Sequence, residues 1–200
     1  MNVLLLSPYS SNLISAIDAC GDHFKVEEGP VSREYCIEHK IDFLVSYGYR
    51  HLLKRDLLEI LPLKAINLHI SMLPYCRGAH PVFWSIVEGR PLGCTIHLLD
   101  EGLDTGNILF QRTVSIDLCV QTFASAYNIL SSAIEQLFEE NWKYLRTGES
   151  AGWRQQGEAS LHKSNELQGW ADFLPLLWDT PVTSFLDLAA VRLSGEFPKT

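Results

Sequence analysis

The sequence lacks several features that define common classes of protein. No stretch approaches the roughly 18 consecutive apolar residues of a membrane-spanning helix. The 16 lysines and arginines are outnumbered by 24 aspartates and glutamates, which gives a formal net charge of −8. An acidic chain is poorly suited to sequence-independent binding of nucleic acid or anionic membranes. We therefore expect no nucleic-acid partner and no membrane association.

The common signatures of phosphate, metal and hydrolase sites are absent as well. The chain contains no GxGxxG, GxxxxGK[ST], HExxH or GxSxG motif and no EF-hand loop. Its five cysteines include no CxxC pair and show no metal-ligand spacing. Scattered thiols in odd number are typical of reduced, cytoplasmic proteins. We therefore expect a cytoplasmic protein that uses no metal ion.

What is present is the composition of an ordinary globular domain, with 200 residues, 46% hydrophobic and 20% charged. Short apolar runs alternate with amphipathic patterns, which predicts a Rossmann-like α/β fold with a mostly parallel open sheet and helices on both faces. The expected strands are Val3–Leu6, Phe24–Val26, Phe43–Ser46, Lys64–His69, Cys94–Leu99 and Ile108–Ser115. The expected helices are Ser10–Cys20, Val31–His39, Leu52–Leu61, Pro81–Glu88 and Thr122–Leu145.

The chain divides in composition after the last of these helices. We predict a sheet domain over residues 1–145 and a small C-terminal extension over residues 146–200 that packs on it. The extension carries Trp153, Trp170 and Trp178, and its acidic residues slightly outnumber its basic ones. Such an aromatic surface offers a contact for a homodimer.

Ligands of open α/β sheets bind beyond the carboxyl ends of the strands. Binding residues are therefore expected just after Leu6, Ser46, His69 and Leu99.

Two polar residues of one predicted strand, Asn67 and His69, lie at such an end. Residues two apart in a strand point to the same face, so both side chains project together. An amide donor beside an imidazole can stabilise an oxyanion. Equally, Asn67 can end the strand and His69 can be an ordinary surface histidine.

Two loops near this pair also combine polar residues with rigid turns. The stretch from Asp100 to Gly106 either turns the chain or aims a carboxylate at His69. The stretch from Ser71 to Pro81 either walls a ligand pocket or connects a strand to a helix.

Five short motifs in this order resemble the folate-dependent formyltransferase family. They are Asn67-x-His69, Ser71-x-Leu-Pro74, Arg77-Gly-Ala-x-Pro81, Gly93-x-Thr-Ile-His97 and Asp100-x-Gly-x-Asp104-x-Gly106. The family includes glycinamide ribonucleotide transformylase, methionyl-tRNA formyltransferase and N-formyltransferases acting on nucleotide-linked amino sugars. The resemblance covers about residues 40–145 and extends weakly to the first 20.

The resemblance implies transfer of a formyl group from N10-formyltetrahydrofolate, the co-substrate, to a primary amine. It makes Asn67, His69 and Asp104 the catalytic residues. Asn67 and a protonated His69 would hold the developing oxyanion, and Asp104 would raise the pKa of His69 and help to remove the proton of the amine. By the same likeness Leu73–Pro74 is expected to be a cis peptide bond.

The resemblance also assigns two sets of binding residues. The folate would lie against Tyr49, Arg50, His51 and Leu52, with Asp100 and Gly102 closing the other side. The acceptor would contact Ser11, Asn12, Ser71, Arg77, Gly78 and His80. Ser11 and Asn12 resemble a phosphate-binding turn, but Pro8 and Tyr9 stand where that turn normally has glycines.

The acceptor expected from the resemblance is the amine of a UDP- or dTDP-linked amino-dideoxy sugar used in surface-glycan biosynthesis. The extension is shorter and more acidic than the tRNA-binding domain of methionyl-tRNA formyltransferases, and Leu161–Ser164 resembles a stretch of the sugar enzymes. Another small amine, of the ribonucleotide or amino-acid type, is the alternative acceptor. A formyltetrahydrofolate hydrolase and a non-catalytic folate- or nucleotide-binding module are the alternative functions.

Overall fold

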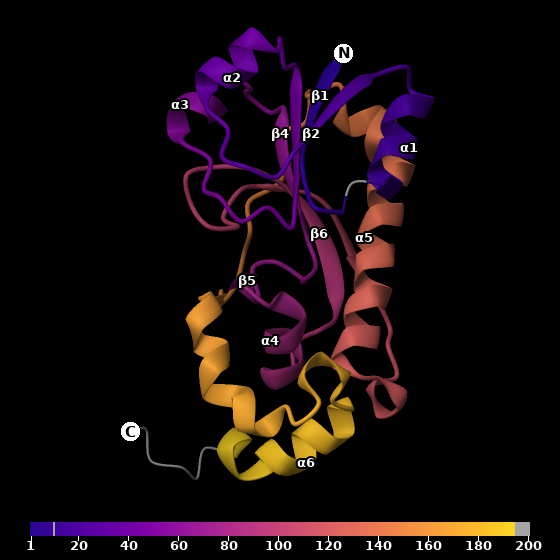
Figure 1. The fold of residues 1–200 in the computed structure, drawn as a ribbon, viewed down its shortest axis with the longest axis vertical. Helices are drawn as coiled ribbons and strands as arrows, with labels where there is room; N and C mark the ends of the chain where they lie inside the picture. The colour runs from indigo at the N-terminus through magenta and orange to yellow at the C-terminus, as the bar shows by residue number, and fades with distance from the viewer. Residues whose placement is uncertain (10, 195–200) are drawn as a thin grey trace.

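A six-stranded sheet forms the centre of the computed structural model, which describes residues 1–9 and 11–194 (Figure 1). The strand order is β2-β1-β3-β4-β6-β7. The first three pairings are parallel and the last two are antiparallel, so the predicted mostly parallel α/β sheet is confirmed. The strands are β1 (Asn2–Leu6), β2 (His23–Glu27), β3 (Phe43–Tyr47), β4 (Ala65–His69), β6 (Gly93–Leu98) and β7 (Ile108–Thr113).

Helices cover both faces of the sheet, because both faces of its inner strands are apolar. In β1, Val3 and Leu5 pack in one hydrophobic cluster with helix α1 (Ser11–Ala19) and helix α5 (Phe123–Leu145). Leu4 and Leu6 pack in a second cluster with α2 (Arg33–Glu38) and α3 (Arg55–Leu58). Two-sided burial of this kind produces continuous apolar strands, as the sequence shows.

Each of these helices lies where the sequence predicted one. A capping box formed by Thr122 and Ser125 starts α5, and the Ser32 side chain caps α2. The helix predicted over 52–61 is much shorter than expected. It contracts to the four residues of α3, because residues 52–54 are not helical and the chain turns from Glu59 onward.

The direction of β6 differs from the expectation. We expected a site after Leu99 at the same sheet edge as those after Leu6, Ser46 and His69. Instead β6 runs antiparallel to β4, and Leu99 donates its N–H to the carbonyl of Ala65 at the opposite end of the strands. The connecting helix α4 (Pro81–Val87) has seven residues and spans about 10 Å. A five-residue strand spans about 17 Å, so this helix does not run the length of a strand, and β6 starts at the edge of the sheet where β4 ends.

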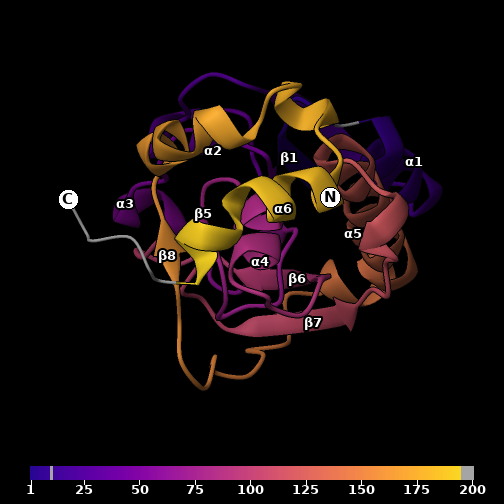
Figure 2. The same ribbon diagram turned by 90° about the horizontal axis from the view of Figure 1, so that it is seen from below.

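The C-terminal extension packs over α4 (Figure 2). A short strand within it, β8 (Leu161–His162), pairs in parallel with β5 (Arg77–Gly78). Trp170 and Phe185 of the extension belong to the same buried cluster as Phe83. The boundary after residue 145 stays a prediction, and the core crosses it. The remaining elements are the 3₁₀ helices η1 (Leu118–Val120), η2 (Ser164–Phe173) and η3 (Leu177–Asp179), and the helix α6 (Val182–Leu193).

Among the described residues, no helix combines the length and the apolar character needed to cross a membrane. All five cysteines are described, and each is a free thiol. The extension was predicted to reach residue 200, and its residues 195–200 lie outside the described part of the chain.

Candidate active site

Asn67, His69 and Asp104 lie together beside β4. The Asn67 amide Nδ2 donates to Asp104 Oδ1 at 3.2 Å, and His69 Nδ1 lies 3.6 Å from Asp104 Oδ2. Their neighbours Ile66 and Leu68 are buried in the large hydrophobic cluster, as the alternation of a strand requires. The three residues that the resemblance assigned to catalysis are therefore brought into one cluster by the fold.

The loop after β6 carries Asp104 to this cluster. Because β6 ends beside the start of β4, the loop must turn back along the sheet to reach Asn67. Asp104 adopts a left-handed backbone conformation with φ of 54°, which is uncommon for a residue other than glycine. The backbone N–H of Gly78 donates to Asp104 Oδ2 at 2.7 Å. The carboxylate is thus held from two sides, by Asn67 and by the Gly78 amide.

The hydrogen bonds of His69 define which ring nitrogen carries its proton. Nε2 lies 3.0 Å from the backbone carbonyl oxygen of Cys76, which can only accept, so we assign the proton to Nε2. In the neutral ring Nδ1 is then an unprotonated nitrogen that faces Asp104. A proton taken up at Nδ1 would therefore lie next to a carboxylate.

The pKa of His69 differs from the expectation. Burial lowers the pKa of His69, and this effect outweighs the nearby Asp104 carboxylate, which raises it as we predicted. Only 6% of His69 is exposed, so little water reaches the ring. Burial therefore favours the neutral imidazole at neutral pH, and a protonated His69 that holds the oxyanion during the reaction stays a prediction.

Asp104 is ionised in the same surroundings. Burial alone would raise the pKa of Asp104, but the positive charge of the His69 and His97 rings when they are protonated, together with the N–H of Gly78, holds it well below its usual range. The site therefore combines a carboxylate with an uncharged imidazole, which is an arrangement suited to taking a proton from a bound nucleophile.

His97 is a fourth member of the cluster, and the sequence alone indicates no role for it. It pairs with Asn67 across β4 and β6, and its Nε2 lies 3.2 Å from Asn67 Nδ2 and 3.4 Å from Asp104 Oδ1. Its Nδ1 faces the carbonyl oxygen of Leu98 at 2.8 Å, so Nε2 accepts from Asn67. The motif that contains His97 was recognised, but only the register of the two strands shows what this side chain contacts.

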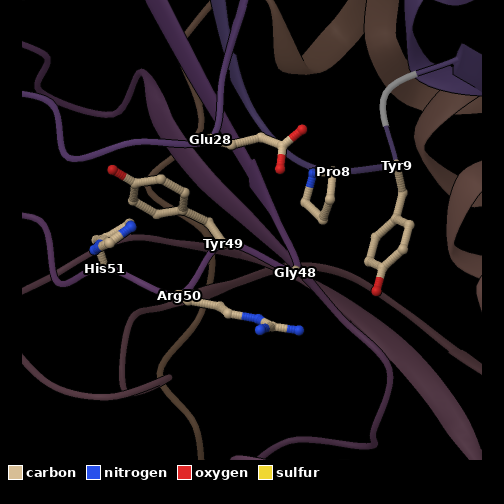
Figure 3. Close-up of a pocket in the computed structure, with 7 residues that line it drawn as sticks. All are labelled: Pro8, Tyr9, Glu28, Gly48, Tyr49, Arg50 and His51. Carbon is tan, nitrogen blue, oxygen red and sulfur yellow. The ribbon is translucent and has the colours of Figure 1, made fainter.

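A pocket of about 250 Å³ opens at the carboxyl ends of β1, β2 and β3 (Figure 3). Tyr49, Arg50 and His51, all expected to contact the folate, line it after β3, and the Tyr49 hydroxyl donates to the carbonyl of Gly29 at 2.8 Å. Leu52 is 82% exposed and does not line this pocket. The remaining lining residues are Pro8, Tyr9, Glu28 and Gly48.

The other two residues expected near the folate organise the loop that carries Asp104. Asp100 Oδ1 accepts from the backbone N–H of Gly102 at 3.1 Å and from the hydroxyl of Thr105 at 2.6 Å. Both Asp100 and Gly102 are exposed. The structure therefore places them in the turn itself, where their contacts are local.

The residues expected to contact the acceptor do not all lie near the catalytic cluster. Gly78 touches Asp104, and His80 packs its ring against Trp178 with 5.6 Å between the ring centroids. Ser71 is wholly buried, and its hydroxyl donates to the carbonyl of Tyr75. Arg77 donates from Nε and Nη2 to the Gln155 side chain.

The predicted phosphate turn lies on the surface at the start of α1. Ser11 and Asn12 are exposed, and Asn12 Nδ2 donates to the carboxylate of Glu135 at 2.5 Å. Glu139 also lines the small pocket beside Asn12. Carboxylates repel a phosphate, so these surroundings do not favour one. Ser10, which belonged to the same predicted turn, lies outside the described residues.

The peptide bond between Leu73 and Pro74 is cis, as predicted. Within residues 1–9 and 11–194, no three histidine, cysteine or acidic side chains are grouped closely enough to hold a metal ion.

The fold is of the α/β class with a polar cluster beside β4, and comparisons with known proteins identify the family as one of group-transfer enzymes. Residues 28–139 match the family model described as formyl transferase. The formyltransferase PseJ from Anoxybacillus kamchatkensis is 37% identical, with a TM-score of 0.87, over 92% of this chain and 97% of that one. The chain belongs to the folate-dependent formyltransferase family.

Other similarities are weaker or more local. A sugar N-formyltransferase structure from Shewanella sp. FDAARGOS_354 is 22% identical with a TM-score of 0.72, over 85% of this chain and 79% of that one, and shares the fold. The methionyl-tRNA formyltransferase of Anaeromyxobacter sp. (strain K) is 50% identical over 76 residues, which are 38% of this chain and 24% of that protein. The match thus spans about a quarter of the length of this curated relative.

Proposed function

We propose that this protein transfers the formyl group of N10-formyltetrahydrofolate to the primary amine of a nucleotide-linked amino sugar. The observation that carries the proposal is the cluster of Asn67, neutral His69 and ionised Asp104 beside β4. When bound, the folate supplies an activated formyl group. The protein must then accept a proton from the attacking amine and stabilise the charge that develops on the formyl oxygen.

His69 is the residue we assign to the proton. Its Nδ1 is unprotonated because the Cys76 carbonyl holds the proton on Nε2. As the amine nitrogen bonds to the formyl carbon, the amine loses a proton to Nδ1. The imidazolium that forms is stabilised by Asp104 at 3.6 Å. When the bond between the formyl carbon and N10 breaks, this proton passes to N10, which leaves the ring neutral again.

Asn67 is the residue we assign to the formyl oxygen. Its amide group is directed at Asp104 Oδ1 and His97 Nε2, both at 3.2 Å. These contacts orient the amide but also use its hydrogens, so stabilising the oxygen requires Asn67 to exchange one of them for the formyl group. A donor held in place before the reaction contributes more to rate than one that must be ordered during it.

The pocket beside Tyr49 fits part of a flat heterocycle such as a pterin. Its volume of about 250 Å³ is close to the lower end for small-molecule sites. Tyr9 and Tyr49 supply aromatic surface, and Arg50, His51 and Glu28 supply polar groups (Figure 3). We infer that Tyr49, Arg50 and His51 contact the folate.

The sugar acceptor is supported by the extent of the match to PseJ, whose complex contains UDP-4,6-dideoxy-4-formamido-L-AltNAc and tetrahydrofolate. That match runs through the C-terminal extension, because it covers 92% of this chain. In sequence, the methionyl-tRNA formyltransferase of Carboxydothermus hydrogenoformans matches over only 45% of its own length. We therefore favour a UDP-linked 4-amino-4,6-dideoxy sugar over tRNA.

The test is a panel of amines incubated with the protein and N10-formyltetrahydrofolate. The panel contains UDP- and dTDP-linked amino-dideoxy sugars, glycinamide ribonucleotide and methionyl-tRNA, and mass spectrometry detects the formylated product. We expect product only with a nucleotide sugar. Formylation of methionyl-tRNA or of the ribonucleotide would show that this molecule, and not a nucleotide sugar, is the acceptor. Release of formate without any acceptor would instead indicate a hydrolase, and binding without turnover would indicate a non-catalytic module.

Surface-glycan biosynthesis, a cytoplasmic location and a homodimer stay predictions. The exposed side chains of Trp153 and Trp178, at 51% and 39%, are consistent with the aromatic contact surface expected of the extension.

A further inference from the structure

Gln155 of the C-terminal extension contacts the loop that carries Asp104. Its Nε2 donates to two backbone carbonyl oxygens of that loop, those of Asp104 and Gly106, both at 2.8 Å. Its Oε1 accepts from Arg77 Nε at 3.1 Å and from Arg77 Nη2 at 2.7 Å. One side chain therefore uses its whole amide group to join the Asp104 loop to the segment beside Gly78.

The hydrogen bonds of Gln155 stabilise an unfavourable backbone conformation at Asp104. Asp104 has a φ of 54°, a left-handed conformation that is unfavourable for a residue with a side chain. A bond to the Asp104 carbonyl fixes the peptide plane that follows this residue. The direction of the carboxylate toward Asn67 and His69 depends on that backbone conformation.

The extension supports His69 as well, through a second contact. The Ser160 hydroxyl accepts from the backbone N–H of Cys76 at 2.9 Å, and the carbonyl of Cys76 in turn accepts from His69 Nε2. Pairing of β8 with β5 holds the same segment. Residues 155–162 thus contact the segments that hold Asp104 and His69. They fall outside the matched family region of residues 28–139.

We propose that Gln155 is a positioning residue for Asp104, and that the C-terminal extension completes the active site through it. The inference rests on the proposed formyl transfer for its activity readout. Gln155 acts through the backbone of Asp104 and Gly106, so it changes the rate of the chemical step and not the binding of the acceptor.

Three variants test this role. Gln155→Ala removes both the Nε2 donor to the loop carbonyls and the Oε1 acceptor of Arg77. Gln155→Glu keeps an oxygen for Arg77 but replaces the donor with a second oxygen, which faces the carbonyls of Asp104 and Gly106. Gln156→Ala is the matched control, since the neighbouring glutamine is exposed and its side chain has none of these bonds among the described contacts.

We expect kcat to fall about 10- to 100-fold in Gln155→Ala and at least as far in Gln155→Glu, with KM for the acceptor within about twofold of wild type. Gln156→Ala keeps wild-type values. In an Asp104→Asn background, Gln155→Ala should cause no further loss, because the two residues act on one group. Wild-type kcat in folded Gln155→Glu, or full additivity with Asp104→Asn, would overturn the proposal.

An NMR titration of His69 provides a readout that needs no acceptor. Displacement of the Asp104 carboxylate removes the charge that raises the pKa of His69, so this pKa should be lower in Gln155→Ala than in wild type. Thermal unfolding verifies that each variant is folded. If wild type transfers no formyl group but the His69 pKa shifts as expected, the proposed function fails and the positioning role stands. An unchanged His69 pKa in a folded Gln155→Ala would contradict the positioning role itself.

Discussion

At the scale of single residues, the state of His69 decides what the cluster can do. Burial disfavours a positive charge on this imidazole, and the Asp104 carboxylate only partly compensates for that effect. In the proposed mechanism the ring therefore accepts a proton and becomes charged only during the reaction. This order of events explains why a neutral base and an ionised acid lie side by side.

The pH dependence of the reaction follows from the same shift. In the proposed mechanism the free enzyme needs unprotonated His69, and burial lowers the pKa of His69 below the ordinary 6.5. As pH falls, the part of the decline in kcat/KM that reports His69 should therefore have its midpoint below 6.5, where Nδ1 is protonated before the amine arrives. A pH–rate profile measured with an excess of folate checks this. A titration of His69 with its midpoint above pH 6.5 would show that the neutral-base assignment is incorrect.

At the scale of elements, the pairing of β5 with β8 joins the extension to the catalytic cluster. Gly78 has a φ of 85°, and a Cβ at this position would overlap the carbonyl oxygen of His162 in β8. The same carbonyl accepts the N–H of Ala79 at 2.9 Å. Only glycine allows these two segments to approach so closely while the Gly78 N–H still reaches Asp104.

Gly78→Ala should therefore destabilise the protein more than a glycine substitution elsewhere. The control is Gly89→Ala, which has a similar φ of 62° and nothing within 4 Å of the added Cβ. Gly89→Ala costs about 1 kcal/mol for its backbone conformation. Gly78→Ala should cost about 1–2 kcal/mol more, because a strand-pair hydrogen bond is disturbed as well. Urea denaturation measures both, and equal losses would refute a tight contact between β5 and β8.

The sequence predicted the elements better than it predicted their contacts. The strand that carries Asn67 and His69 was found because alternation places both on one face. Antiparallel β6 was missed, since the direction of a strand depends on the sheet edge at which the connecting segment ends, which local patterns do not show. The role of His97 depends on the register with Asn67, and that of Gln155 on docking of a distant segment. Neither is encoded in local spacing.

The lowered pKa of His69 could not be predicted for the same reason. The motif indicated a carboxylate nearby, which raises the pKa, but burial of the ring depends on packing from several elements. The local sequence pattern therefore predicted that Asp104 lies near His69. It did not predict that burial has the larger effect on the pKa of His69.

At the scale of the whole molecule, the extension and the sheet domain share one core. Phe185 of α6 is fully buried, and its ring lies 5.5 Å from Phe83 in α4 and 5.1 Å from Phe123 in α5. Aromatic contacts of this kind cross the predicted boundary after residue 145. We therefore expect the two parts to unfold together.

Phe185→Ala tests this coupling. Removing the ring should lower the free energy of unfolding by about 3–5 kcal/mol, and in a single transition. Leu188→Ala on the same helix is the control, because Leu188 is 56% exposed and should change stability by no more than about 0.5 kcal/mol. Denaturation followed by both tryptophan fluorescence and circular dichroism measures the transition. Two separated transitions in Phe185→Ala would show that the extension is an independent appendage.

The most direct test of the central claim is formyl transfer by Asn67→Ala, His69→Ala and Asp104→Ala variants, measured with a ¹³C-labelled formyl donor and the nucleotide-sugar acceptor. Because the three side chains act on one reacting group, each variant should lose at least about 100-fold in kcat while remaining folded. Wild type should place the label on the sugar amine. Wild-type turnover in His69→Ala, or label that never reaches the amine, would contradict the account.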